Sequence, residues 1–344
     1  MNPATQFLLL EPQRRALAFE QAATQRAVDA VIIEKDFWVC WLLGVLFSHP
    51  ELAPHFVFKG GTSLSKVFGV IDRFSEDVDL SVSPAFVGAD AQAFDALASR
   101  TQRDAAMAEM QRQCSVKVEE TIAPLLDAAV REALGPPTGG DHWLHHELNE
   151  QTHSPILNFH YPATQTTGLS YVPRAVTLEL GSLTDQQPVG RHVIRPWVAE
   201  EFPAAFADWQ CEVTALELAR SFWEKATILH AEYHRPQDQP TPDRYARHYA
   251  DLARLLDHPN AAAFMEDKAL AARVVDWKSR VFARGWARYD LARHGSFKLE
   301  PPIHRQAALA QDYATMRPMF LTEPPPFAQV MQQLAAAEQT INAL

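Results

Sequence analysis

The sequence predicts an α+β amino-terminal domain, residues 1–205, followed by a helical carboxy-terminal domain, residues 206–344. Two observations support this fold class. A strand–turn–helix–strand pattern spans residues 56–82, and further stretches of alternating apolar residues follow it within the first domain. From about Cys211 onward, the apolar residues recur with helical spacing to the end of the chain.

The composition is that of a globular protein with room for a large core. The chain has 344 residues, of which 47% are hydrophobic and 21% are charged. The net charge of −11 argues against a protein that simply coats nucleic acid, although a local basic surface remains compatible with it. Its apolar runs are too short for a membrane span, no basic region precedes the first of them, and its three cysteines are widely spaced. We therefore expect a cytoplasmic protein without a membrane partner.

The first domain begins with helices. Residues 11–48 predict two of them, and the second, VIIEKDFWVCWLLGVLF, is apolar almost all round and should be deeply buried. Residues 88–135 predict two more helices, ending at Gly135. Strands are predicted at 156–161 and 175–183.

The second domain is predicted to consist of helices separated by loops that contain proline. Their expected ranges are 212–233, 243–257, 261–284, 303–317 and 325–342.

Residues 58–82, FKGGTSLSKVFGVIDRFSEDVDLSV, combine a Gly-Gly turn with an acid-x-acid strand. Strand alternation places Asp77 and Asp79 on one face, opposite Val78 and its apolar neighbours. A turn between a strand and a helix directs backbone N–H groups at an anion, and paired carboxylates hold Mg²⁺. The pattern therefore favours a Mg²⁺–nucleotide site, with Glu179 on the polar face of a neighbouring strand as a candidate third ligand. A solvated acidic surface is the alternative.

These motifs resemble the signature of the DNA polymerase β-like nucleotidyltransferases. More closely, KGGTSLSK, RFSEDVDL and IIEKDFW are similar to the AbiEii/AbiGii toxin family, the toxin halves of bacterial toxin–antitoxin and phage-defence pairs. The similar residues span 31–257, about two thirds of the chain. The resemblance implies a nucleotidyltransferase-like small mixed sheet flanked by helices, followed by a helical carboxy-terminal domain.

Four motifs of the family have counterparts here. The first, a Gly-Ser pair followed after three residues by a basic residue, is met from Gly61 to Lys66, with Thr for Ser and Lys for Arg. A bidentate arginine contact would be lost by that change. The second is the acid-x-acid pair already described. The third is Lys225 in SFWEKATILH, and the fourth is Asp251 in RYARHYADL.

The resemblance implies nucleotidyl transfer from an NTP with Mg²⁺ or Mn²⁺ as cofactor. The carboxylates of Asp77 and Asp79 would hold the metal. The β- and γ-phosphates would be bound by a group of residues from the first motif: Gly60, Gly61, Thr62, Ser63 and Lys66. The role implied for Lys225 is stabilisation of the leaving pyrophosphate.

Three roles remain open for Asp251: orienting Lys225, orienting Arg247, or activating the attacking hydroxyl. Each of the last two motifs also has a purely structural interpretation. Lys225 could be an exposed helix lysine paired with an acid such as Glu232, and Asp251 could form a surface ion pair with Arg247.

The resemblance also implies an RNA acceptor, with tRNA 3′ ends among the targets, and a cognate antitoxin. Residues 273–305 contain eight Lys/Arg against three acids, interleaved with aromatic residues. Basic and aromatic residues together suit phosphate contacts and base stacking, so Arg280, Arg284 and Arg288 are candidate RNA contacts. An amphipathic helix that buries its aromatic residues is the alternative.

His142, His145 and His146 in HWLHHEL lack the partners of a metal site and predict a surface helix instead. Two other functions compete with RNA modification. One is nucleotide transfer to a protein hydroxyl or a small molecule, and the other is a catalytically silent binding module. Retention of clustered carboxylates argues against the silent module, because such groups are costly to keep together.

Overall fold

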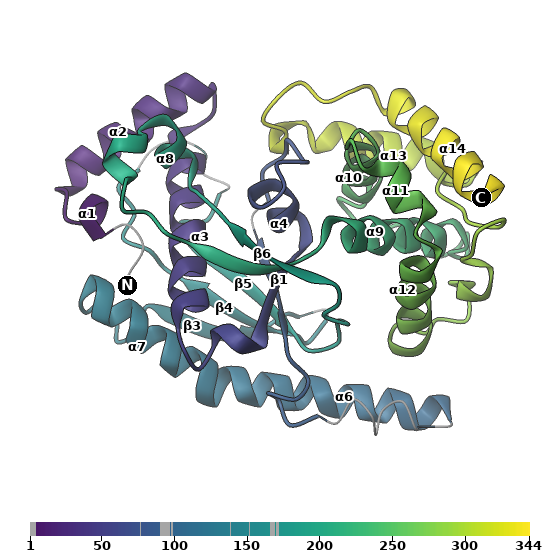
Figure 1. Ribbon diagram of the computed structural model, residues 1–344, viewed down its shortest axis with the longest axis horizontal. Helices are drawn as coiled ribbons and strands as arrows, with labels where there is room; N and C mark the ends of the chain where they lie inside the picture. Colours follow the sequence, from purple (N-terminus) through teal and green to yellow (C-terminus); the bar gives the residue numbers. More distant parts are fainter. Residues whose placement is uncertain are drawn as a thin grey trace. The chain divides into compact units, whose positions relative to one another are not determined.

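The computed structural model describes residues 5–75, 77–89, 97, 99–137, 139–150, 152–165, 169 and 172–344. The chain forms two compact units (Figure 1). The first consists of Met1–Val67 and Ser75–Leu216, and the second of Phe68–Phe74 and Glu217–Leu344. A short segment between the glycine turn and the acid-x-acid strand therefore belongs to the second unit.

A seven-stranded mixed sheet lies at the centre of the first unit, in the order β3-β4-β5-β2-β1-β7-β6. The strands are β1 (Phe56–Lys59), β2 (Asp77–Val82), β3 (Leu144–Leu148), β4 (Pro155–Phe159), β5 (Val176–Gly181), β6 (Val189–Val193) and β7 (Glu212–Leu216). The β2/β5 and β1/β7 pairs are parallel, and the other pairs are antiparallel. The acid-x-acid strand β2 thus has a hydrogen-bonded neighbour on each side.

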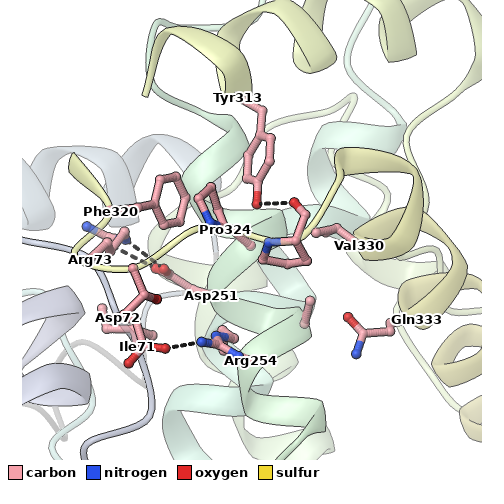
Figure 2. Close-up of a pocket in the computed structure, with 14 residues that line it drawn as sticks. Ile71, Asp72, Arg73, Asp251, Arg254, Tyr313, Phe320, Pro324, Val330 and Gln333 are labelled. Carbon is pink, nitrogen blue, oxygen red and sulfur yellow. Dashed lines mark hydrogen bonds and ion pairs between the residues drawn. The ribbon is translucent and has the colours of Figure 1, made fainter. Parts of the chain in front are cut away.

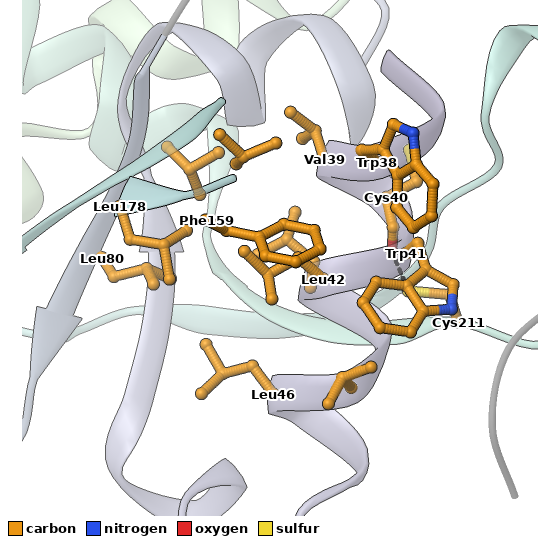
Figure 3. Close-up of a cluster of buried hydrophobic side chains, with 14 of the residues drawn as sticks. Trp38, Val39, Cys40, Trp41, Leu42, Leu46, Leu80, Phe159, Leu178 and Cys211 are labelled. Carbon is orange, nitrogen blue, oxygen red and sulfur yellow. Dashed lines mark hydrogen bonds between the residues drawn. The ribbon is translucent and has the colours of Figure 1, made fainter. Parts of the chain in front are cut away.

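Helix α3 (Ala30–Ser48) forms much of the core of the first unit. Asp29 caps its first turn by accepting a hydrogen bond from the Val31 N–H, and every residue from 31 to 46 is buried. Trp41 stacks on Phe159 of β4 with 5.8 Å between ring centroids, beside apolar residues of β2 and β5 (Figure 3). The prediction of a deeply buried helix is confirmed.

The other helices of the first unit have these bounds: α1 (Thr5–Leu8), α2 (Pro12–Arg26), α4 (Gly60–Lys66), α6 (Arg100–Lys117), α7 (Ala123–Leu134) and α8 (Trp197–Glu201). A π-helical turn, Val118–Ile122, joins α6 directly to α7, where two separate helices were predicted. Residues 90–96 and 98 of that predicted helical range lie outside the described residues.

Three strands correct the sequence predictions. HWLHHEL was predicted to be a helix, but its residues 144–148 form β3, which pairs with β4 along its whole length. Strand β6 was not predicted, and β7 occupies the start of the predicted helix 212–233. These segments are only five residues long, so periodicity alone does not distinguish them from helix, and sheet pairing decides their conformation.

The two units divide after β7, whereas the sequence suggested a domain boundary near residue 205. Strand β7 pairs with both β1 and β6, so its hydrogen bonds hold it in the sheet of the first unit. The helical part of the chain therefore begins at Leu218.

The second unit is helical, as predicted. Its helices are α9 (Leu218–Tyr233), α10 (Ala246–Leu256), α11 (Ala261–Glu266), α12 (Lys268–Val281), α13 (Ile303–Thr315) and α14 (Phe327–Ala343). Asp267 divides the predicted helix 261–284 in two, because its side chain caps α12 by accepting a hydrogen bond from the Leu270 N–H. Within the described residues, no helix combines the length and apolar character that a bilayer span requires.

Candidate active site

The glycine turn and the acid-x-acid strand are in direct contact within the first unit. Strand β1 leads into α4, as the sequence predicted, and Gly60 at the junction has a φ of +78°. A Cβ added to Gly60 would lie 1.9 Å from Oδ2 of Asp79. Only glycine therefore permits the Asp79 carboxylate to lie against the backbone of the turn.

The hydroxyl groups of the turn hold it together. Thr62 Oγ1 donates a hydrogen bond to the Asp77 carbonyl oxygen, and Ser63 Oγ donates to the Gly60 carbonyl oxygen at 3.1 Å. Both side chains are buried. The sequence predicted that these hydroxyls would bind phosphate, whereas in the structure both donate to backbone carbonyl oxygens.

Alternation along β2 is confirmed, since Val78 and Leu80 are buried while Asp77 and Asp79 on the opposite face are half-buried. In the register of the sheet, Asp79 lies between Lys59 of β1 and Glu179 of β5. Lys59 Nζ is 3.7 Å from Asp79 Oδ1. Sequence analysis missed Lys59, although its position immediately before the Gly-Gly pair was a usable signal.

Asp77 and Asp79 have the chemistry that a divalent metal needs. Mg²⁺ is usually held by one or two carboxylates and completes its coordination with water and phosphate oxygens. Among the described residues, no group of three or more His, Cys, Asp or Glu side chains could hold a metal ion. The geometry thus does not support Glu179 as a third ligand, and two carboxylates are the number that Mg²⁺ sites in proteins commonly use.

Lys66 is not presented to a ligand, contrary to the sequence prediction. Its Nζ lies 2.7 Å from Asp36 Oδ1 of α3, and both side chains are only 4% exposed. The same ammonium lies 4.7 Å from the ring centroid of Trp197, whose backbone N–H donates to Asp36 Oδ2 at 2.6 Å. Lys66 thus anchors the end of α4 to the core and to α8.

In the second unit, the third and fourth motifs meet in a buried ion pair. Lys225 Nζ of α9 lies 2.7 Å from Asp251 Oδ2 of α10, with the side chains 11% and 1% exposed. Arg73 binds the same carboxylate through Nε and Nη2, each at 2.8 Å (Figure 2). Of the predicted roles for Asp251, orienting Lys225 has this direct contact in its favour.

The electrostatics of this cluster favour a bound anion. Burial alone would raise the pKa of Asp251, but the charges of Arg73 and Lys225 hold it far below its usual range. Burial lowers the pKa of Lys225, and Arg73 adds to that effect while Asp251 opposes it. Two cations thus share one carboxylate, which leaves one excess positive charge.

His248 is a further neighbour of Lys225, with its Nδ1 3.2 Å from Lys225 Nζ. Burial and the nearby ammonium keep the pKa of His248 well below its ordinary value, so the neutral ring accepts this hydrogen bond. An ammonium has three donors. In the described part of the chain, Asp251 and His248 use two of them, and one is left for a substrate oxygen.

Arg73 and His248 were missed by sequence analysis. Arg73 lies within RFSEDVDL, which carried the family resemblance, but its partner Asp251 is 178 residues away in the sequence. His248 lies three positions before Asp251 on the same helix. The helical spacing between His248 and Asp251 was the one sequence signal for the histidine. No sequence pattern indicated that Arg73 would pair with Asp251.

The predicted RNA-binding arginines already have neighbours. Arg280 pairs with Asp276 at 2.6 Å, and exposed Arg288 pairs with Asp290 at 2.9 Å. Arg284 lies 5.9 Å from the ring centroid of Trp286. These contacts reduce the excess charge that the segment presents, because acids on the same segment neutralise part of it.

Comparison with known proteins identifies the family. The profile described as "Nucleotidyl transferase AbiEii toxin, Type IV TA system" matches residues 41–335. The chain belongs to the AbiEii family. The matched range includes the glycine turn, the acid-x-acid strand, Lys225 and Asp251, so the resemblance seen in the sequence is confirmed.

A search of the curated proteins finds no match to this AbiEii-family chain. Among solved structures, the chain is similar to MenT4, a nucleotidyltransferase toxin from Mycobacterium tuberculosis H37Rv. The sequences are 16% identical, the similarity covers 94% of this chain and 98% of MenT4, and the TM-score is 0.44.

Proposed function

We propose that this AbiEii-family protein is a toxin that transfers a nucleotide from an NTP to an RNA acceptor in the cytoplasm. The 3′ ends of tRNA are the first acceptors to test, and the proposed protein partner is a cognate antitoxin. The contact between Gly60 and Asp79 carries the proposal. This contact brings together the two motifs that a metal-dependent nucleotidyltransferase needs. The glycine turn leaves space beside its backbone, and the Asp79 carboxylate occupies that space.

We assign Asp77 and Asp79 to a divalent cation, Mg²⁺ or Mn²⁺. When bound, the cation would neutralise charge on the triphosphate. Lys59 Nζ lies 3.7 Å from Asp79 Oδ1, near enough for the lysine to turn towards a phosphate beside that carboxylate. The hydrogen bond from Thr62 to the Asp77 carbonyl oxygen keeps the turn and the strand in register.

Lys225 has the role of stabilising the leaving pyrophosphate. In the reaction, the acceptor hydroxyl oxygen bonds to the α-phosphorus, the bond to pyrophosphate breaks, and the hydroxyl proton passes to water. The remaining N–H of Lys225 would donate to an oxygen of the departing group. Asp251 is a poor proton acceptor, because two cations hold its pKa down. We therefore assign Asp251 and Arg73 to positioning Lys225.

A labelling experiment tests this function. Each NTP, labelled at the α-phosphate, is incubated with the protein, Mg²⁺ and total RNA, and labelled products are separated into RNA, protein and small molecules. We expect label in RNA, none without metal, and none with Asp77→Asn. Label in protein or in a small molecule would identify the other acceptor classes. Metal-dependent NTP affinity that is equal in wild type and Asp77→Asn, measured by calorimetry, would overturn the metal assignment.

A further inference from the structure

Arg247 of α10 is a half-buried cation whose side chain has no partner among the described residues. Its guanidinium carries five N–H donors, and within the described part of the chain none of them forms a hydrogen bond or an ion pair. Two other arginines of the second unit are neutralised, since Arg254 pairs with Asp72 and Arg288 pairs with Asp290. The donors of Arg247 are therefore not occupied by these protein groups.

The spacing along α10 would ordinarily give this arginine a partner. Arg247 precedes Asp251 by four residues, the separation at which a helix brings an arginine and an aspartate together. The Asp251 carboxylate has other donors, however. Its Oδ1 accepts from Arg73 Nε, and its Oδ2 accepts from Arg73 Nη2 and Lys225 Nζ. Asp251 thus serves the cluster instead of neutralising Arg247.

Helix α10 presents Arg247 on the face that meets Lys225. His248 and Asp251 both contact Lys225 Nζ, at 3.2 Å and 2.7 Å. Residues 247, 248 and 251 together span about 100° of the helix circumference, because each residue advances the helix by roughly that angle. The arginine therefore shares a face of α10 with the two groups that hold the lysine.

The charge of Arg247 acts on the same cluster. Burial is the main reason that the pKa values of Lys225 and His248 are lowered, and the positive charge of Arg247 lowers both further. The ring of His248 stays neutral, so Arg73, Lys225 and Arg247 contribute three positive charges against the one negative charge of Asp251. With Arg247 included, the cluster has two excess positive charges.

An anion with several oxygens fits these groups. Like charges held close together repel one another, and a bound anion removes that cost. Lys225 keeps one N–H donor, and Arg247 keeps its planar fork, which binds phosphate oxygens in pairs. Because the donors come from two helices, α9 and α10, they suit a ligand with oxygens on two phosphorus atoms better than a single carboxylate.

We propose that Arg247 and Lys225 together bind the β- and γ-phosphates of the NTP and hold them as the leaving pyrophosphate. The inference rests on the proposed function for the choice of ligand. As the bond to the α-phosphorus breaks, its electron pair passes to the pyrophosphate oxygen. The guanidinium of Arg247 would donate to oxygens of this group as its negative charge grows. Arg247 is then a catalytic residue, whereas Arg73 positions Lys225 through Asp251.

Binding of inorganic pyrophosphate in metal-free buffer tests the cation pair separately from transfer. Calorimetry at constant ionic strength compares wild type with Arg247→Gln, Arg247→Lys, Lys225→Met and Arg244→Gln. Arg244 is the matched control, because it lies three residues before Arg247, is exposed, and loses the same charge. The urea unfolding midpoint of each variant shows whether it is folded.

We expect Arg247→Gln and Lys225→Met each to bind pyrophosphate about tenfold more weakly than wild type, since each loses a charged hydrogen bond. Arg244→Gln should bind like wild type. Arg247→Lys should lie between the two, because lysine keeps the charge but not the fork of donors. No binding to wild type, equal affinity of Arg247→Gln and wild type, or equal weakening by Arg244→Gln would overturn the proposal.

Transfer kinetics then test whether the bound anion is the leaving group. Relative to Arg244→Gln, Arg247→Gln should lower kcat/KM for NTP by about tenfold and leave the KM for RNA unchanged. A rise in the KM for RNA alone would assign the site to an RNA phosphate and overturn the proposal. If wild type transfers no label while the expected pattern of pyrophosphate binding holds, the cation pair is confirmed and only the proposed function fails.

Discussion

Each unit contains a lysine paired with an aspartate, and the two pairs differ in their surroundings. In the first unit, Lys66 meets Asp36 at 2.7 Å with both side chains 4% exposed. In the second, Lys225 meets Asp251 at the same distance, with 11% and 1% exposed. Distance and burial alone would assign the two lysines the same role.

The neighbours of each pair separate the roles. Burial would lower the pKa of Lys66, but Asp36 outweighs it and the pKa is raised, with the Trp197 ring covering the ammonium. Burial lowers the pKa of Lys225, and Arg73 contributes in the same direction. One pair is electrically balanced, whereas the other carries excess positive charge. The balanced pair suits an anchor, and the unbalanced one suits an anion site.

Loss of stability should be the largest effect, and it should follow removal of the Lys66 ammonium. Lys66→Met leaves the Asp36 carboxylate buried without its counter-ion, which costs about 3–5 kcal/mol of unfolding free energy. Urea unfolding measures it. For comparison, Lys225→Met should cost clearly less, because Asp251 keeps both hydrogen bonds from Arg73. Equal losses in the two variants would contradict the distinction between the pairs.

Loss of activity should show the opposite order. Lys225→Ala removes the charge assigned to the leaving pyrophosphate, so kcat for nucleotide transfer should fall by about tenfold or more while the protein stays folded. Lys66→Met, assayed at a temperature where it is fully folded, should retain most of its kcat. Unchanged turnover in Lys225→Ala would leave that lysine a structural role only.

The pH dependence should separate the two lysines as well. Because the pKa of Lys225 is lowered from its ordinary value of 10.5, transfer should decline on the alkaline side before an ordinary lysine titrates. Lys225→Arg stays charged and should move the decline to higher pH. A decline at the same pH in both proteins would show that another group causes it.

Stability should also fall at alkaline pH through Lys66, but at a higher pH, because the pKa of this lysine is shifted in the opposite direction to that of Lys225. Its pKa is raised above the ordinary value of 10.5, so its contribution is complete below that value. The contribution is lost only as the pH rises through the raised pKa. Urea midpoints of wild type and Lys66→Met should therefore stay apart up to that pH and approach each other above it.

The smallest effect is expected at the arginines that already have acidic or aromatic neighbours. Replacing Arg280, Arg284 and Arg288 by Gln should weaken RNA binding modestly and flatten its dependence on salt, because fewer counterions are released. Filter binding at several salt concentrations measures this, and NTP affinity serves as the control. An unchanged salt slope together with a lower melting temperature would show that these arginines have a structural role.

The sequence by itself determined the parts that depend on local pattern. Alternation placed Asp77 and Asp79 on one face of a strand, and all-round apolar character buried α3. The Gly-Gly pair marked the turn before α4 because few other residues adopt its backbone conformation. These features depend only on residues that are close together in the sequence. The family motifs in turn predicted the assignment to a toxin family.

Only the tertiary structure decided which partner each charge has. Lys66 pairs with Asp36 rather than facing a phosphate, and Arg73 reaches Asp251 across 178 residues of sequence. Strands β3, β6 and β7 likewise form because neighbouring strands satisfy their backbone groups. A buried charge takes whichever partner the fold brings within hydrogen-bonding distance, because leaving it unpaired costs more than any local preference contributes.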